Sequence, residues 1–235
     1  MTVIKYIRLP FNFDSLLLQK EVFNIGSAYW QMHYQKLHYE GGWSAIPLRS
    51  IGGKADDVFI SPHADALYQD TIFLQQDSYI AKVLSTFKCE LQAVRLLKLD
   101  AHSIIKEHKD AELSFEHGSI RLHIPVITHD EVVFLLDKER MNLKEGECWY
   151  MNFNLPHSIH NKSSQDRIHL VIDALVNDWI KEIFQEPSVL KKEIEKPIYD
   201  AATKQKIIAQ LREMNTEIGN RLADEMETDL QQHEQ

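Results

Sequence analysis

The sequence predicts a mainly β protein with flanking helices, whose core is a jelly roll, the double-stranded β-helix made of two facing antiparallel sheets. Two observations predict this fold class. Between residues 91 and 174, short apolar runs are separated by turn residues at a spacing that allows eight strands. Polar and apolar residues also alternate within several runs, as in strands that bury one face. Many short, evenly spaced strands are typical of closed or double-sheet antiparallel architectures.

Residues 1–90 are expected to form an N-terminal region that packs on this core. Its segment 54–75 resembles a loop long enough to act as a lid. The other expected elements follow from alternation, from a capping Asp-Ser pair and from helical spacing. They are a strand at 2–9, a helix that begins at Asp14 and Ser15, an extended segment at 43–51, and a helix near 79–87.

Residues 91–174 form the expected jelly-roll core, and residues 175–235 form a helical C-terminal extension. One apolar stripe in the extension predicts an amphipathic helix that packs on its own domain, with a homodimer contact as the alternative. A separate domain is not expected, because one such helix holds only a small core. The stripe consists of Ile207, Ile208, Leu211, Met214, Ile218 and Leu222. The core strands are expected near 92–99, 103–108, 118–127, 131–136, 139–143, 146–153, 157–161 and 167–174.

Composition and charge argue against several classes of protein. A net charge of -9 gives no basic surface for nucleic acid or for an anionic membrane. No apolar stretch approaches the roughly 18 residues of a membrane span, and the N-terminus lacks a basic region followed by a long apolar one. Cys89 and Cys148 form no metal-type pair and are expected to be small buried apolar residues. We therefore expect a soluble protein of the cytoplasm.

The most informative polar residues are two imidazoles, one carboxylate and a later arginine: His108, Asp110, His157 and Arg167. Two neutral imidazoles and a carboxylate suit Fe(II), and three protein ligands on one face leave positions open for a cosubstrate and dioxygen. Arginine offers a rigid fork that meets a carboxylate through two hydrogen bonds. The set therefore predicts a non-haem iron centre that consumes a 2-oxo acid.

Short motifs of this kind also occur by chance, and the chain contains a second His-x-Asp sequence, His63-Ala64-Asp65. This second sequence follows Ser-Pro in a turn-like setting, and nothing downstream pairs with it, so a solvated loop is its simpler interpretation. His108, by contrast, follows an apolar run of strand type and precedes further strands. We therefore expect His108 and Asp110 to carry the chemistry.

Strand periodicity gathers further polar residues on single faces. In the strand near 118–127, Arg121 and His123 share the face opposite four apolar residues. In the strand near 167–174, the corresponding polar face carries Arg167, His169 and Asp173. In a jelly roll such a face can line the cavity. The alternative interpretation is that these residues are surface charges on an edge or outer face.

The order and spacing of several motifs are more specific than any one of them. Over residues 43–174 the chain resembles the aspartyl/asparaginyl β-hydroxylase family, and within that family it is most similar to the bacterial L-proline cis-hydroxylases. The motifs that carry the resemblance are Arg95 to Leu99, Ile104 to Asp110, Ile120 to Pro125, Gly146 to Tyr150, Leu155 to Ser158 and Arg167 to Asp173.

The resemblance implies a role for each residue at a matching position. His108, Asp110 and His157 are implied as Fe(II) ligands, and Arg167 as the anchor of the distal carboxylate of 2-oxoglutarate. Two more residues match an Arg-x-His that lies beside this cosubstrate in the family: Arg121 and His123. Dioxygen is then the second cosubstrate. The implied reaction converts 2-oxoglutarate to succinate and carbon dioxide while a carbon of the substrate is hydroxylated.

The distal histidine ligand must be chosen between two nearby candidates. His157 and His160 are three residues apart, and His157 is preferred because it follows the family-like Leu-Pro and lies ten residues before Arg167.

For the substrate, Trp43 and Arg49 lie in a segment similar to one in the proline hydroxylases. A regular strand would place both on one face, as an aromatic wall and a carboxylate clamp. A buried structural Trp and a surface Arg are the alternative.

We therefore interpret the chain as an Fe(II)- and 2-oxoglutarate-dependent hydroxylase acting on a free amino acid such as a proline-like substrate. Hydroxylation of Asp, Asn or Pro residues in a peptide or protein is the nearest alternative. A metal-dependent hydrolase or isomerase of cupin-like architecture would need no distal carboxylate anchor, which argues against that rival. A non-catalytic cupin-like binding or sensory module is disfavoured by the complete ligand triad.

Overall fold

The computed structural model of the chain describes residues 2–60, 67–110, 113–187, 189–195 and 200–232. Contacts divide the chain into two compact units. The larger unit is Ile4–Glu193, and the smaller unit joins Met1–Val3 to Ile194–Gln235. The larger unit contains both sheets of the fold and all the residues of the candidate site.

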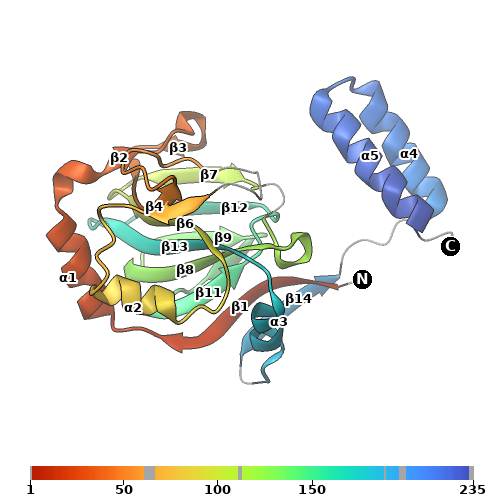
Figure 1. The fold of residues 1–235 in the computed structure, drawn as a ribbon. Helices are drawn as coiled ribbons and strands as arrows, with labels where there is room; N and C mark the ends of the chain where they lie inside the picture. The colour runs from red at the N-terminus through yellow and green to blue at the C-terminus, as the bar shows by residue number, and fades with distance from the viewer. Residues whose placement is uncertain (1, 61–66, 111–112, 188, 196–199, 233–235) are drawn as a thin grey trace. The chain divides into compact units, whose positions relative to one another are not determined.

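Two antiparallel sheets form the predicted jelly roll, so the fold class is confirmed (Figure 1). The larger sheet has the order β14-β1-β11-β8-β13-β6-β4-β2, with β5 paired to β4. Its strands are β1 (Thr2–Asn12), β2 (Gln31–Met32), β4 (Trp43–Ile51), β5 (Tyr68–Asp70), β6 (Leu91–Leu99), β8 (Ser119–Ile127), β11 (Glu147–Met151), β13 (Arg167–Leu175) and β14 (Leu190–Glu195). The smaller sheet has the order β10-β9-β12-β7-β3. Its strands are β3 (Tyr39–Glu40), β7 (Ile104–His108), β9 (Val132–Leu136), β10 (Glu139–Met141) and β12 (His157–Asn161).

Three helices of the larger unit begin where short polar side chains cap them. They are α1 (Ser15–Ile25), α2 (Tyr79–Ser85) and α3 (Asp178–Gln185). The side chain of Asp14 accepts hydrogen bonds from the first backbone N–H groups of α1, as predicted from the sequence. Ser78 caps α2 and Asn177 caps α3 in the same way. Each cap therefore fixes the residue at which the preceding segment ends and the helix begins.

The two faces of the larger sheet have different neighbours. On one face the apolar residues of β8, such as Leu122 and Ile124, form one cluster with residues of the helices, such as Leu18 and Phe184. On the other face, apolar side chains of the two sheets meet in a second cluster. This second cluster includes Leu99, Trp149 and Met151 from the larger sheet and Ile105, Phe134 and Ile159 from the smaller one. The polar residues of the larger sheet that point toward the smaller sheet are therefore enclosed.

The sheets draw strands from outside residues 91–174. β1 pairs with β11, and β4 pairs with β6, so the N-terminal region supplies part of the larger sheet itself. β14 lies in the segment that was expected to be helical, and its sequence Leu-Lys-Lys-Glu-Ile-Glu is mostly exposed. A charged edge strand has too few apolar residues to show strand periodicity, which explains why the sequence did not predict it. The division of the chain at residues 90 and 174 stays a prediction.

The smaller unit is a hairpin of two helices, α4 (Ala201–Glu213) and α5 (Glu217–Gln232). The single apolar stripe expected here is wrong, because the chain turns between the helices at Asn215, whose φ of 47° is left-handed. Ile208 and Ala223 are buried between the two helices among the described residues, whereas Ile218 is exposed. A homodimer contact through this segment stays a prediction. Among the described residues, none of the helices combines the length and the apolar composition that a membrane crossing requires.

Candidate metal centre

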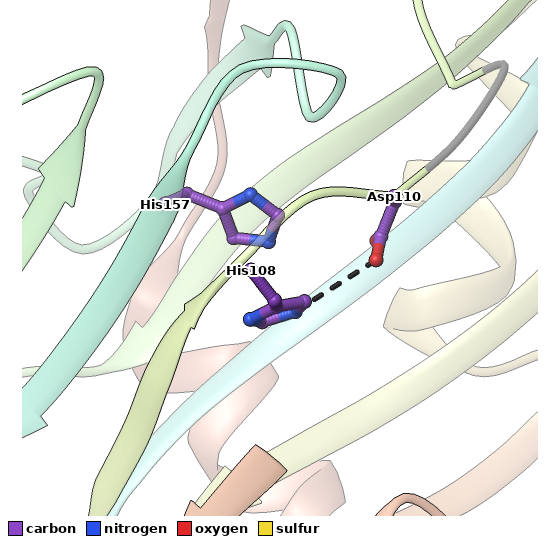
Figure 2. Close-up of side chains that lie close together, drawn as sticks. All are labelled: His108, Asp110 and His157. Atoms are coloured by element: carbon purple, nitrogen blue, oxygen red, sulfur yellow. Dashed lines mark ion pairs between the residues drawn. The ribbon is translucent and has the colours of Figure 1, made fainter. Parts of the chain in front are cut away.

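The two histidines of the predicted triad lie directly opposite each other on neighbouring strands. β12 pairs with β7 so that His157 is the register partner of His108, and the two rings are 4.2 Å apart between centroids. Asp110 lies two residues beyond His108, where its backbone N–H donates to the carbonyl of Phe153 at 2.9 Å. Figure 2 shows the three side chains converging, with His108 Nε2 3.7 Å from Asp110 Oδ1.

Both imidazoles are held in the tautomer that a metal needs. The Nδ1 atom of His108 is 2.7 Å from the carbonyl oxygen of Lys106, and Nδ1 of His157 is 3.1 Å from that of Leu155. Because a carbonyl only accepts, each Nδ1 carries the proton and each Nε2 keeps its lone pair. One potential ligand atom from each of the three residues lies within 4.8 Å of the others. Two imidazole nitrogens and one carboxylate oxygen are a donor set that fits Fe(II).

The electrostatic environment favours the protonation states that bind a metal. Burial lowers the pKa of His157 to about 4, so the ring is neutral near pH 7. Burial alone would raise the pKa of Asp110, but the Arg121 guanidinium and the neighbouring imidazoles hold it below its usual value. A neutral imidazole and an ionised carboxylate need lose no proton before they coordinate a cation.

Arg121 connects Asp110 to a second buried carboxylate. Its Nη1 donates to Asp110 Oδ2 at 2.6 Å, and its Nε and Nη2 donate to the two oxygens of Asp173 at 2.6 and 3.0 Å. Arg95 also donates to Asp173, at 3.2 Å. Arg121 and Asp173 are thus on the enclosed face of the sheet, and the alternative interpretation as surface charges is wrong for them.

Arg167 is a buried cation that lacks a carboxylate partner among the described residues. It is 2% exposed, its Nη2 donates to Nδ1 of His169 at 2.8 Å, and its Nε has no hydrogen-bond partner. Burial lowers its pKa, and no carboxylate opposes that shift. Leaving a buried charge without a counter-ion is costly, so the geometry fits an anion that arrives with a ligand.

His169 links this arginine to His123. The Nδ1 atoms of the two histidines are 3.2 Å apart, and the ring of His123 stacks on Phe153 with 5.1 Å between centroids. Burial and the nearby Arg167 hold the pKa of both histidines well below the usual value. The Nε2 atom of His123 is buried without a partner among the described residues, so it can serve a bound molecule.

These side chains line one cavity of about 440 Å³ between the sheets. Its wall includes the three triad residues together with Arg121, His123 and Arg167. Trp43 also lines it, and stacks on His33 with 3.5 Å between ring centroids and 11° between planes. The role of Trp43 toward a substrate stays a prediction.

Arg49 does not line the cavity in the described structure, and the prediction that it shares a face with Trp43 is wrong. The pairing of β4 with β6 shifts register between Pro47 and Arg49, which is a β-bulge. One extra residue reverses the side-chain alternation beyond the bulge. Arg49 instead pairs with Asp70 at 2.5 Å and donates to two backbone carbonyl groups.

His160 falls outside the site, whereas the second His-x-Asp sequence lies outside the described residues. His160 is half-buried on β12 and is absent from both the ligand cluster and the cavity wall. His63 and Asp65 lie outside the described residues. The same applies to part of the segment 54–75, so its role as a lid stays a prediction.

Arg95 and His33 also line the cavity, although the sequence suggested a site role for neither. Arg95 is 2% exposed and its Nε is buried without a partner among the described residues. A cation in phase with the apolar Leu97 and Leu99 of the same strand was the signal that could have identified it. No periodic signal marks His33, because it lies in an irregular segment directly after the two-residue strand β2.

The buried histidines predict that acid destabilises the metal-free protein. Burial lowers the pKa of His33 to about 3 and that of His157 to about 4, whereas both are near 6.5 in an unfolded chain. Below about pH 6.5 the unfolded chain binds more protons, so the free energy of unfolding falls with pH by up to about 1.4 kcal/mol per pH unit for each histidine. Melting temperatures measured between about pH 7 and pH 5 should show the decline.

The variant His33→Phe separates this effect from general acid sensitivity. Phenylalanine preserves the stack on Trp43 but cannot take up a proton. The melting temperature of the variant should therefore fall less steeply with pH than that of the wild type. An identical slope in both proteins would contradict the assignment.

The fold and the ligand set together define a class: jelly-roll proteins that carry two imidazoles and one carboxylate on an enclosed sheet face. A family model described as Aspartyl/Asparaginyl beta-hydroxylase matches residues 16–176, and the chain belongs to this family. The family resemblance seen in the sequence is thereby confirmed, and the match begins earlier than residue 43.

Two curated proteins and one solved structure illustrate what the chain is similar to. The L-proline cis-4-hydroxylase of Rhizobium meliloti (strain 1021) is 28% identical over 136 residues, which are 57% of this chain and 48% of the relative. The L-proline cis-3-hydroxylase 2 of Streptomyces sp is 24% identical over 155 residues, 63% of this chain and 53% of the relative. A prolyl-4-hydroxylase structure from Pseudomonas putida is 9% identical, with a TM-score of 0.43 over 69% of this chain and 86% of that one. The chain spans about half the length of the curated relatives it matches.

Proposed function

We propose that the protein is an Fe(II)- and 2-oxoglutarate-dependent hydroxylase that acts on a free, proline-like amino acid. The observation that carries this proposal is that one cavity contains both the His108, Asp110 and His157 cluster and the unpaired buried cation Arg167. Metal-dependent hydrolysis or isomerisation needs the first feature but not the second. A 2-oxo acid with a distal carboxylate uses both.

Each part of the site has a separate task in this proposal. When bound, iron(II) supplies the activation of dioxygen that is coupled to decarboxylation of 2-oxoglutarate and to hydroxylation of the substrate. The triad provides three ligand atoms from one side and leaves the other positions open. The fork of Arg167 fixes the distal carboxylate of 2-oxoglutarate, while His123 lines the same cavity. The enclosing sheets limit the access of water and so limit competing reactions.

The cavity wall supports a small substrate that carries a carboxylate. The stacked rings of Trp43 and His33 present a flat apolar surface, and burial together with Arg95 and Arg121 keeps His33 uncharged near neutral pH. Arg95 replaces Arg49 in the proposal as the group that binds the substrate carboxylate, because Arg95 lines the cavity and has an unused Nε donor. A cavity of about 440 Å³ is in the size range of small-molecule sites.

The proposal predicts which compounds stimulate turnover. Purified protein with Fe(II), 2-oxoglutarate and dioxygen should release succinate faster when proline or a proline-like amino acid is added, and mass spectrometry should show a product heavier by one oxygen atom. Trp43→Ala should raise the KM for that amino acid, whereas Trp30→Ala should not. Trp30 is the matched control because it packs against the core on the helix-covered face of the larger sheet.

Three outcomes distinguish the rivals. Product formed only from peptides or from a folded protein that carries Asp, Asn or Pro would replace the free amino acid by the alternative substrate. Metal and 2-oxoglutarate binding without any stimulated turnover would favour the binding or sensory module. Turnover that does not require 2-oxoglutarate would contradict the proposed class of reaction.

A further inference from the structure

Three buried charges and one half-buried charge, of alternating sign, lead from the cavity wall to the metal cluster. In order along the contacts they are Arg95, Asp173, Arg121 and Asp110. The side chains of Arg95, Asp173 and Arg121 are 3%, 2% and 10% exposed. Neighbouring strands provide this arrangement, since Asp173 of β13 is the register partner of Arg121 of β8.

The two oxygen atoms of Asp110 have different neighbours. Oδ2 accepts from Nη1 of Arg121 at 2.6 Å, while Oδ1 faces Nε2 of His108 at 3.7 Å. Asp173 holds the Nε–Nη2 edge of the Arg121 guanidinium, and in this orientation Arg121 contacts Asp110 through Nη1. One oxygen of Asp110 thus remains directed toward the histidines.

We infer that Asp173 is a positioning residue for the metal centre, which acts through Arg121 to keep one oxygen of Asp110 available as a ligand. The inference rests on the proposed metal site. It assigns a role to a residue that is neither a ligand nor a member of the Arg-x-His sequence. Both oxygens of Asp173 are engaged by the two arginines, from which they accept three hydrogen bonds.

The geometry of a guanidinium explains why Arg121 needs this restraint. Two of its parallel N–H groups match the two oxygens of a carboxylate, and this paired arrangement is the favoured one. Without Asp173 holding Nε and Nη2, Arg121 can turn and engage both oxygens of Asp110. That contact competes with the metal for the same lone pairs, so metal affinity falls.

The substitution Asp173→Asn tests the inference in the metal-free protein. Asparagine keeps the shape of the side chain, but its amide N–H₂ group cannot accept from a guanidinium. Titration with Co(II), without dioxygen or 2-oxoglutarate, should show a dissociation constant about 10- to 100-fold higher than in the wild type, the usual effect of losing an outer-shell partner. The visible absorption of bound Co(II) should also change, because the ligand set is altered.

The matched control is Asp70→Asn. Asp70 is also a carboxylate paired with an arginine, Arg49 at 2.5 Å, but the pair lies outside the cavity wall. This control should leave both Co(II) affinity and the Co(II) spectrum unchanged. Melting temperatures of all variants show whether each protein is folded. Wild-type affinity and spectrum in folded Asp173→Asn would overturn the inference.

A double-mutant cycle distinguishes positioning from a simple electrostatic effect. Removing the charge of Asp173 also leaves more positive charge near the metal, and that field would weaken Co(II) binding with or without Asp110. If Asp173 acts through Asp110, Asp173→Asn should have no further effect in an Asp110→Ala background. An undiminished loss in that background would overturn the positioning role.

A second variant keeps the test decisive if Asp173→Asn does not fold. Arg121→Lys preserves the positive charge but cannot contact Asp173 and Asp110 at once with a fixed fork. It should weaken Co(II) binding and alter its spectrum, and a folded variant with neither change would overturn the inference. A different result would contradict the proposed metal centre itself: no Co(II) binding to the wild type, or Co(II) binding that His157→Ala leaves unchanged.

Discussion

Replacing Asp110 or His157 by alanine is expected to abolish succinate formation while the jelly roll stays folded. Each substitution removes one of the three protein ligands. Among the described residues, the ligand cluster contains no fourth histidine or carboxylate that could replace the lost one. The substitutions also remove a polar group rather than an apolar one, so the loss of packing is small. Coupled measurements should show succinate release falling to background and metal affinity reduced to what the two remaining ligands provide.

The matched control for His157 is His160→Ala on the same strand. His160 is half-buried and lies outside the cavity wall, so its removal should leave turnover unchanged. His63→Ala tests the second His-x-Asp sequence. Full loss of activity in His63→Ala, with none in His108→Ala, would show that the wrong motif was assigned to the metal.

The parts of the fold that could be predicted are those in which one face of a strand is apolar. Ile120, Leu122 and Ile124 alternate with Arg121 and His123 in the sequence, and the apolar set forms the core against the helices. Because the period of a strand is two, this pattern fixes which side chains point into the cavity. All eight core strands expected from the sequence are present in the structure.

The parts that could not be predicted depend on small local departures from regular geometry. The β-bulge before Arg49 reverses the side-chain alternation, and Pro47, a residue that strands tolerate at edges as well as at bulges, is its one sign in the sequence. The backbone carbonyls of Lys106 and Leu155 set the histidine tautomers, although every residue type carries a carbonyl. The pairing of Asp173 with Arg121 depends on strand register, which a single sequence specifies only through its apolar pattern.

Arg167→Ala is expected to weaken the binding of 2-oxoglutarate by about two orders of magnitude or more. A charge-assisted hydrogen bond to a carboxylate contributes about 1.5–3 kcal/mol, and a fork can form two of them. The protein supplies no competing carboxylate among the described residues, so the full interaction is available to the ligand. Titration of the metal-loaded protein without dioxygen gives the dissociation constant.

Two further variants show whether the fork or only the charge is needed. Arg167→Lys should recover only part of the affinity, because a point charge on a flexible chain cannot form two parallel hydrogen bonds. Arg140→Ala is the control, since Arg140 is exposed and its Nη2 donates only to the backbone carbonyl of Asp130, at 2.6 Å. Equal 2-oxoglutarate affinity in the wild type and in folded Arg167→Ala would remove Arg167 from the cosubstrate site, and with it the main argument for a 2-oxo acid.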